Sequence, residues 1–197
     1  MSDTAKISME YEARCMIDEN QFDFIKKDYL AYPNTKRIIT NKNIYFETPS
    51  LYLVNHHMVL RLRHINNDKE ELTLKIKGEE GDIEINYPLT KKETMDLIDD
   101  IEIPDPVIKN KLIELGVNLE SLEIVTTLFT ERIEIDFPDH IFIIDKNFYN
   151  NKIDYNLEVE STSKEKAQRY LEKIVKPYNI KLDKNYMSKS RRAILKL

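Results

Sequence analysis

Four pairs of like charge lie two residues apart in segments whose composition is typical of β-strands. The acidic pairs are Glu10 with Glu12 and Glu158 with Glu160, and the basic pairs are Arg61 with Arg63 and Lys75 with Lys77. A strand sends residues i and i+2 to the same face, so each pair places two like charges side by side. Such charges repel one another unless a metal ion, a counter-charge or a substrate neutralises them. The pattern is typical of a site for a metal-bound polyanion.

No single strand of this kind requires a function, because an antiparallel sheet with one face in water also alternates apolar and charged side chains. The set of strands is different from a solvated surface: some carry carboxylates, one carries arginines and another carries lysines. Arg binds phosphate through two parallel hydrogen bonds, and Lys adds a point charge beside it. Closing the strands into a barrel would bring all of these charges to one axis and leave the apolar faces outside.

The apolar periodicity supplies elements for such a barrel. Strands are predicted at about 7–17, 36–48, 58–65, 71–77, 82–88, 122–137, 140–147 and 152–161. Amphipathic helices are predicted at about 22–30, 91–98, 106–115 and 164–176, and they would cover the outward strand faces. The expected fold class is α+β, mainly antiparallel β, in which a closed barrel with a polar lumen has helices packed outside. We expect one domain over residues 1–197.

Composition narrows the classes of partner. The chain has 197 residues and a net charge of -5, which argues against a general nucleic-acid binder because affinity for the phosphate backbone needs an excess of Lys and Arg. The single cysteine, Cys15, excludes an intrachain disulfide and is predicted to be a small core residue. No apolar run approaches the length of a signal segment or a membrane span. We expect a cytoplasmic protein, monomeric or homodimeric, without a membrane or nucleic-acid polymer as partner.

Several motifs resemble those of one known family, and they follow one another along the chain in the same order as in that family. They are Glu10-Tyr11-Glu12-Ala13-Arg14, Tyr45-Phe46-Glu47-Thr48-Pro49, Leu60-Arg61-Leu62-Arg63, Thr73-Leu74-Lys75-Ile76-Lys77, the strand of Arg132, Asp145, and Tyr155-Asn156-Leu157-Glu158-Val159-Glu160. The chain resembles the CYTH superfamily, or triphosphate tunnel metalloenzymes, and especially its small stand-alone bacterial members. Arg14 departs from the family signature, which has Lys at this position. An arginine can bind phosphate but cannot give up a proton as a lysine can.

The resemblance implies an eight-stranded antiparallel tunnel that binds a triphosphate and a divalent metal in its lumen. It assigns metal ligands to Glu10, Glu12, Asp145, Glu158 and Glu160. It assigns triphosphate binding to Arg61, Arg63, Lys75, Lys77, Arg132 and Lys189. Catalytic roles fall to Arg14, Lys75 and Glu84. Because the expected ligands are all carboxylates, the cofactor expected is Mg²⁺ or Mn²⁺, which prefer hard oxygen donors.

The motifs leave the reaction open among three classes. The first is hydrolysis of inorganic tripolyphosphate, or less selectively of nucleoside triphosphates, with thiamine triphosphate as a variant substrate. The second is cyclisation of ATP, as in class IV adenylyl cyclases. The third is a non-catalytic sensor of polyphosphate or nucleotide. Lys189 also has two interpretations, because the basic segment 183–197 can be a surface charge run or can enter the tunnel.

Overall fold

Eight antiparallel strands close into a barrel in the computed structural model, which describes residues 4–34, 36–183 and 186–197. The strands are β1 (Lys6–Ile17), β2 (Lys36–Glu47), β3 (Met58–Ile65), β4 (Lys69–Ile76), β5 (Asp82–Pro88), β6 (Glu123–Asp136), β7 (His140–Tyr149) and β8 (Lys152–Ser161). Around the barrel the order is β1-β5-β4-β3-β2-β6-β7-β8, and β8 pairs with β1 to close it. The predicted fold class and all eight predicted strands are therefore confirmed.

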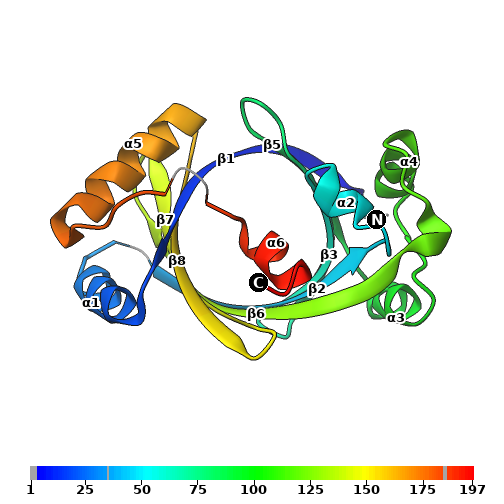
Figure 1. The fold of residues 1–197 in the computed structure, drawn as a ribbon, viewed down its shortest axis with the longest axis horizontal. Coiled ribbons are helices and arrows are strands. Elements are labelled where there is room, and N and C mark those ends of the chain that lie inside the picture. Colours follow the sequence, from blue (N-terminus) through cyan, green and yellow to red (C-terminus); the bar gives the residue numbers. More distant parts are fainter. Residues whose placement is uncertain (1–3, 35, 184–185) are drawn as a thin grey trace.

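Helices cover the outside of this barrel and one helix enters it. The helices are α1 (Glu19–Leu30), α2 (Tyr52–Asn55), α3 (Lys91–Asp99), α4 (Pro106–Glu114), α5 (Lys164–Val175) and α6 (Lys189–Ile194). Figure 1 shows α1 and α5 outside one side of the ring of strands and α3 and α4 outside the opposite side. Their position outside the barrel was predicted. The short helices α2 and α6 were not predicted, and α6 lies inside the ring (Figure 1). Within the described ranges, none of the helices has the length and apolar character needed to cross a membrane.

Side-chain caps explain where the outer helices begin. At the start of α1, Asp18 accepts a hydrogen bond from the backbone N–H of Gln21 at 2.8 Å, and the Gln21 side chain bonds back to the backbone of Asp18. Thr90 and Glu93 form the same reciprocal capping box at α3. Such caps satisfy N–H groups that have no partner within the helix and typically contribute about 1 kcal/mol each. The polar residue before each helix therefore fixes the point at which the chain leaves the barrel.

The outer helices bury the apolar strand faces in two layers. Under α1 and α5 the first layer contains Ile25 and Leu171 with the strand residue Val159, all at most 1% exposed. Under α3 and α4 the second layer contains Leu97 and Ile108, which are fully buried. Cys15 belongs to the first layer and is 1% exposed, as predicted for a core residue. Each fully buried aliphatic side chain contributes about 1.5–3 kcal/mol, so these layers hold the helices to the barrel.

A third apolar group, here called the inner apolar cluster, lies on the other side of the sheet. It consists of Tyr45, Val54, Leu128, Tyr149, Ala193 and Ile194. Two of these residues belong to α6, so the cluster anchors α6 against the inward faces of β2, β6 and β7. This part of the lumen is therefore filled with apolar side chains, and the polar part lies beside it.

The outer layer generates a test on one strand. Ile38 and Ile44 both lie on the outward face of β2, but Ile44 is 7% exposed beneath the helices and Ile38 is 74% exposed. We expect Ile44→Ala to lower the free energy of unfolding by about 2–4 kcal/mol, because it leaves a cavity in a packed layer. Ile38→Ala, the matched control, should change it by only about 0.5 kcal/mol. Urea denaturation measures both, and equal losses would contradict the assignment of the covered face.

Candidate functional site

Charged side chains from the inward strand faces surround a cavity of about 800 Å³ inside the barrel. All but one of the functional residues predicted from the sequence line it. They are Glu10, Glu12, Arg14, Arg61, Arg63, Lys75, Lys77, Glu84, Arg132, Glu158, Glu160 and Lys189. The exception is Asp145, which is fully buried behind its ion-pair partners. Lys189 thus enters the lumen on α6 and is not part of a surface charge run.

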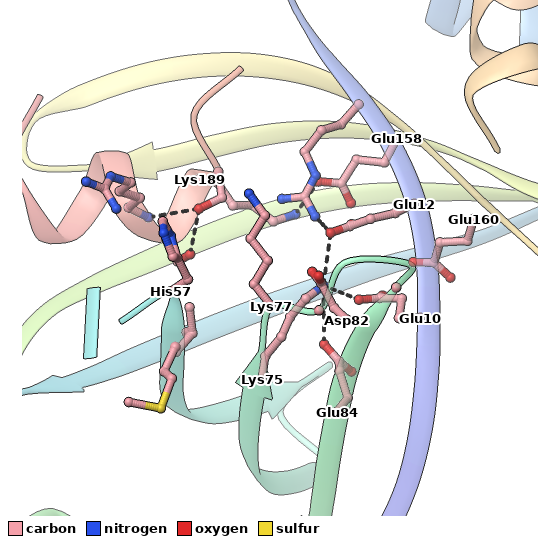
Figure 2. Close-up of a pocket in the computed structure, with 18 of the residues that line it drawn as sticks. Glu10, Glu12, His57, Lys75, Lys77, Asp82, Glu84, Glu158, Glu160 and Lys189 are labelled. Atoms are coloured by element: carbon pink, nitrogen blue, oxygen red, sulfur yellow. Dashed lines mark hydrogen bonds and ion pairs between the residues drawn. The ribbon is translucent and has the colours of Figure 1, made fainter. Parts of the chain in front are cut away.

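Four carboxylates meet around the ammonium group of Lys75, and we call this group of five residues the Lys75 cluster. The Lys75 Nζ lies 2.9 Å from an oxygen of Glu12, 3.1 Å from Asp82 and 3.7 Å from Glu84, and it also forms an ion pair with Glu10. Figure 2 shows these side chains pointing toward one another from β1, β4 and β5. The strand register explains the meeting, because Glu84 lies opposite Lys75 and Glu10 lies opposite Asp82.

The surroundings of Glu84 within this cluster favour its ionised form. Burial alone would raise the pKa of Glu84, but Arg61, Lys75 and Arg63 outweigh it and lower that pKa to about 2. Glu84 is therefore charged throughout the physiological range. Removing a cation that pairs with buried carboxylates would leave their charge uncompensated, which is strongly destabilising.

Three carboxylates of the Lys75 cluster lie close enough together to hold a metal ion. One oxygen from each of Glu10, Glu12 and Asp82 lies within 4.8 Å of the other two. Hard oxygen donors of this kind suit Mg²⁺ or Mn²⁺, so the residues fit the cofactor that the sequence implied. Asp82 was not among the predicted ligands. The sequence could have indicated it, because Asp82 and Glu84 form a further acidic pair two residues apart.

A second group, the Asp145 cluster, contains Arg132, Asp145, Glu158 and Lys189. Arg132 donates to both oxygens of Asp145 at 2.8 Å and to Glu158 at 2.9 Å. The Lys189 Nζ donates to Asp145 at 2.6 Å and lies 3.3 Å from Glu158. These cations hold the pKa of Asp145 below its usual range, although burial acts in the opposite direction. The two cations thus neutralise both carboxylates of the cluster.

The structure separates the predicted metal ligands into two places. Glu10 and Glu12 belong to the grouped carboxylates described above, whereas Asp145, Glu158 and Glu160 lie outside that group. Both oxygens of Asp145 already accept bonds from Arg132, Lys189 and Asn156. A metal role for Asp145 and Glu158 would require these cations to move, so it stays a prediction.

Glu160 lies at the β1–β8 junction, opposite Glu12 in the register. Burial, followed by repulsion from Glu10, raises the pKa of its carboxyl to about 7. Glu158, the other member of this acidic pair, has a pKa well below the usual range, because Lys189, Arg14 and Arg132 outweigh the effect of burial. The two carboxyls of this predicted pair therefore differ in charge near neutral pH.

Positive charge is in excess on the β3 side of the cavity. Arg63 donates to the side chain of Asn43 at 3.0 Å, and no ion pair of Arg63 occurs within the described part of the chain. Burial and the neighbouring Arg61 lower the pKa of Arg63 to about 10. Lys77 lines the same cavity from the end of β4. Desolvated cations without full compensation attract an anion, and phosphate oxygens match the geometry of guanidinium groups.

The Tyr45-Phe46-Glu47-Thr48-Pro49 segment positions the edge of the cavity. The buried Glu47 carboxylate accepts hydrogen bonds from the backbone N–H groups of Leu53 at 2.9 Å and Val54 at 2.8 Å, at the start of α2. The carbonyl of Val54 in turn accepts a hydrogen bond at 3.1 Å from Arg191 of α6. Glu47 therefore fixes the turn from β2 into α2, and α2 in turn accepts a hydrogen bond from α6.

The environment of Glu160 predicts a pH-dependent stability. A carboxyl whose folded pKa is about 7 binds a proton more tightly in the folded state, so its ionisation costs stability as pH rises from about 4.5 to 7. Glu160→Gln lacks this cost. In EDTA we expect the free energy of unfolding of the variant, relative to wild type, to rise by roughly 1–3 kcal/mol between pH 5 and pH 8. Urea denaturation at both pH values checks this.

Glu131→Gln is the control, because Glu131 is exposed on β6. Its stability relative to wild type should be the same at both pH values. A Glu160→Gln variant that gains nothing at pH 8 would show that Glu160 titrates as an ordinary exposed carboxyl.

Comparison with known proteins finds a matching family, a related protein and a similar solved structure. The model of the CYTH domain matches residues 8–191 of this chain. The Bacillus subtilis (strain 168) protein named "Putative triphosphatase YjbK" is 29% identical over 173 residues, which cover 87% of each protein. The crystal structure of a "putative adenylate cyclase" from Bacillus halodurans superposes with a TM-score of 0.86 at 25% identity, over 94% of this chain and 97% of that one.

A more distant likeness extends the fold comparison. The structure of HpAC1 from Hippeastrum, described as a "putative adenylyl cyclase" with a dominant triphosphatase activity, has a TM-score of 0.74 at 20% identity. It covers 93% of this chain and 94% of that chain. At this identity the likeness concerns the fold alone. The barrel, its charged lumen and the match over residues 8–191 agree, and the chain belongs to the CYTH domain family.

Proposed function

We propose that this protein is a divalent-metal-dependent triphosphatase whose substrate is inorganic tripolyphosphate, with nucleoside triphosphates hydrolysed more slowly. The observation that carries the proposal is the division of the cavity wall, in which an acidic group on β1 and β5 is separated by β4 alone from an excess of arginine on β3. The relative YjbK, which bears a triphosphatase name, supports the reaction class. We further propose that residues 1–197 act as one domain, in the cytoplasm, on a small-molecule partner.

Within this proposal, Glu10, Glu12 and Asp82 would hold Mg²⁺ or Mn²⁺. The ion supplies neutralisation of phosphate oxygens and activation of water. Lys75 now occupies the space between these carboxylates, at 2.9 Å from Glu12 and 3.1 Å from Asp82. With a metal ion as the counter-charge there, Lys75 would be free to bind the triphosphate. The lysine side chain suits this role because it is a point charge on a flexible stem, without a fixed bonding plane.

The remaining cations position the phosphate chain. Arg61 and Arg63 project from β3 and bind phosphate oxygens, while Arg132 and Lys189 line the same cavity and can donate further hydrogen bonds from the Asp145 cluster. Phosphoryl transfer depends on positioning and charge neutralisation more than on covalent chemistry, so no enzyme-bound intermediate is needed. Glu84 keeps Arg61 and Lys75 oriented, at 3.6 Å and 3.7 Å. Arg14, beside Glu12 and Glu158, contributes charge to the leaving phosphate but not a proton.

Comparing the products formed from several triphosphates tests the reaction type. Hydrolysis needs only a positioned water beside the terminal phosphate, whereas cyclisation also needs a site that orients adenine and ribose. We expect orthophosphate release from tripolyphosphate with Mg²⁺ or Mn²⁺ to exceed that from ATP, with no cyclic AMP formed. Chromatographic quantification of phosphate, pyrophosphate and cyclic AMP, with thiamine triphosphate as a further substrate, checks this. Cyclic AMP accumulating with pyrophosphate would establish a cyclase, and tight binding without turnover would establish a sensor.

The metal assignment generates a separate test. Asp82→Asn removes one of three grouped ligands, so we expect the Mg²⁺ concentration for half-maximal activity to rise at least about tenfold. Glu84→Gln removes the same charge from the Lys75 cluster but not a grouped ligand, so it should change this concentration far less, whatever it does to the maximal rate. Titration of activity with Mg²⁺ measures both. Equal shifts in the two variants would mean that charge alone, and not ligation by Asp82, sets the Mg²⁺ requirement.

A further inference from the structure

The ring of Tyr186 lines the cavity just before α6 begins, and it lies against two arginines. The guanidinium carbon of Arg14 is 5.7 Å from the centre of this ring, and that of Arg192 is 5.5 Å from it. A guanidinium group within about 6 Å of a ring centre is attracted by the negative face of the ring, and the attraction is stronger where water is excluded. Tyr186 thus connects an arginine of β1 to an arginine of α6.

Arg192 fixes the position of Tyr186. Its Nη1 donates one hydrogen bond to the Tyr186 hydroxyl at 3.1 Å and another to the carbonyl oxygen of Met187 at 2.5 Å. Its Nε and Nη2 donate to the two carboxylate oxygens of Asp154 on β8, at 2.9 Å and 3.0 Å. A bidentate pair of this kind fixes the orientation of the guanidinium group. The place of the Tyr186 ring is therefore set from the wall of the barrel.

Arg14 is the residue at which this chain departs from the family signature, which has Lys there. A lysine acts as a point charge, whereas a guanidinium group is planar and donates hydrogen bonds only in fixed directions. An arginine at this position therefore has to be oriented before it can bind a phosphate oxygen. The ion pair with Glu12 holds one nitrogen of Arg14, and a second contact is needed to set the plane of the group.

The ring of Tyr186 can supply that second contact. A ring face attracts a guanidinium group while its N–H donors stay available for oxygen atoms. The Arg14 side chain lines the cavity and is 16% exposed, so a ligand in the cavity can reach it. Burial acts against the charge of Arg14, but Glu158 and further acidic groups raise its pKa above the ordinary value. Arg14 is thus a charged donor at the cavity wall, held between Glu12 and an aromatic ring.

We propose that Tyr186 is a positioning residue that orients the Arg14 guanidinium group toward the phosphate chain. This inference rests on the proposed function, in which Arg14 supplies charge to the leaving phosphate. The support runs from Asp154 through Arg192 to Tyr186, and from its ring to Arg14. The helix α6 therefore serves the site in two ways: Lys189 lines the cavity directly, and Arg192 acts through Tyr186.

Tyr186→Leu tests the inference because it removes the ring and keeps an apolar side chain. We expect kcat for tripolyphosphate with Mg²⁺ to fall by about fivefold or more, because Arg14 acts on charge that develops in the transition state. KM should change by less than about twofold, because the ground-state contacts of the other cations remain. A raised KM with unchanged kcat would contradict the inference, since it would mean that α6 had loosened and carried Lys189 with it. Steady-state kinetics measures both constants.

Tyr186→Phe separates the ring from the hydroxyl. This variant keeps the ring, and Arg192 keeps its bond to the carbonyl of Met187, so kcat should stay within about twofold of wild type. If Tyr186→Phe lost as much kcat as Tyr186→Leu, the hydroxyl and not the ring would be responsible, and the inference would be wrong.

Arg14→Ala shows whether Tyr186 acts through Arg14. In this background Tyr186→Leu should lower kcat by less than about a further twofold, because the group that the ring orients is gone. An undiminished effect would mean that the two residues act independently. Tyr170→Leu is the matched control, because Arg169 and Lys173 also lie over the ring of Tyr170, but on α5 outside the barrel. Its kcat should equal that of wild type, and a loss as large as in Tyr186→Leu would contradict the inference.

The same measurements separate the inference from the proposed function. If wild type hydrolyses tripolyphosphate and Tyr186→Leu has the same kcat, the inference is wrong and the proposed function stands. If wild type neither binds nor hydrolyses tripolyphosphate, both are wrong.

Discussion

Closure of the barrel brings the inward strand faces, most of which carry charged side chains, into one enclosed space, and the neutralisation of that charge is the constraint on which the structure depends. Charges removed from water are tolerated only with close partners and further hydrogen bonds. The protein meets this condition fully in the Asp145 cluster, where Arg132 and Lys189 balance Asp145 and Glu158, and only partly in the Lys75 cluster, where one ammonium group contacts four carboxylates. The helix α6 is part of the solution, because it delivers Lys189 into the lumen. The residues whose ion pairs stabilise the barrel are therefore the same residues that form the candidate site.

Internal neutralisation also shapes how the site can work. The cations that would bind a phosphate chain are partly occupied by the protein's own carboxylates, and the carboxylates that would bind metal are occupied by Lys75. In the proposed function, metal and substrate together would give new partners to both kinds of group, whereas either one alone would give partners to only one kind. Arg61 and Arg63 are less compensated than the others. The β3 side of the lumen is thus the place where an anion gains most from entering.

Much of this could be predicted from the sequence, because the relevant signals are local. Strand alternation of period two and the apolar periodicity of the helices need only neighbouring residues, and they located every strand and the outer helices α1, α3, α4 and α5. The position of α6 could not be predicted, since six residues are too few to show helical periodicity. The partners of Asp145 depend on the register of β6, β7 and β8 and on the path of the C-terminal segment, which are long-range properties. The position of Asp82 could be predicted in part. Its spacing of two residues from Glu84 can be read from the sequence, but its approach to Glu10 depends on the pairing of β1 with β5.

The two faces of each strand also constrain how this chain can diverge. In β3, for example, Leu60 and Leu62 are fully buried under the helices while Arg61 and Arg63 line the lumen. Inserting or deleting one residue within such a strand would exchange the faces, placing guanidinium groups in the apolar layer and leucines in the cavity. Point substitutions change one wall at a time, but length changes inside strands damage both walls at once. Homologous chains should therefore keep strand lengths nearly constant and vary in length at turns and helix termini.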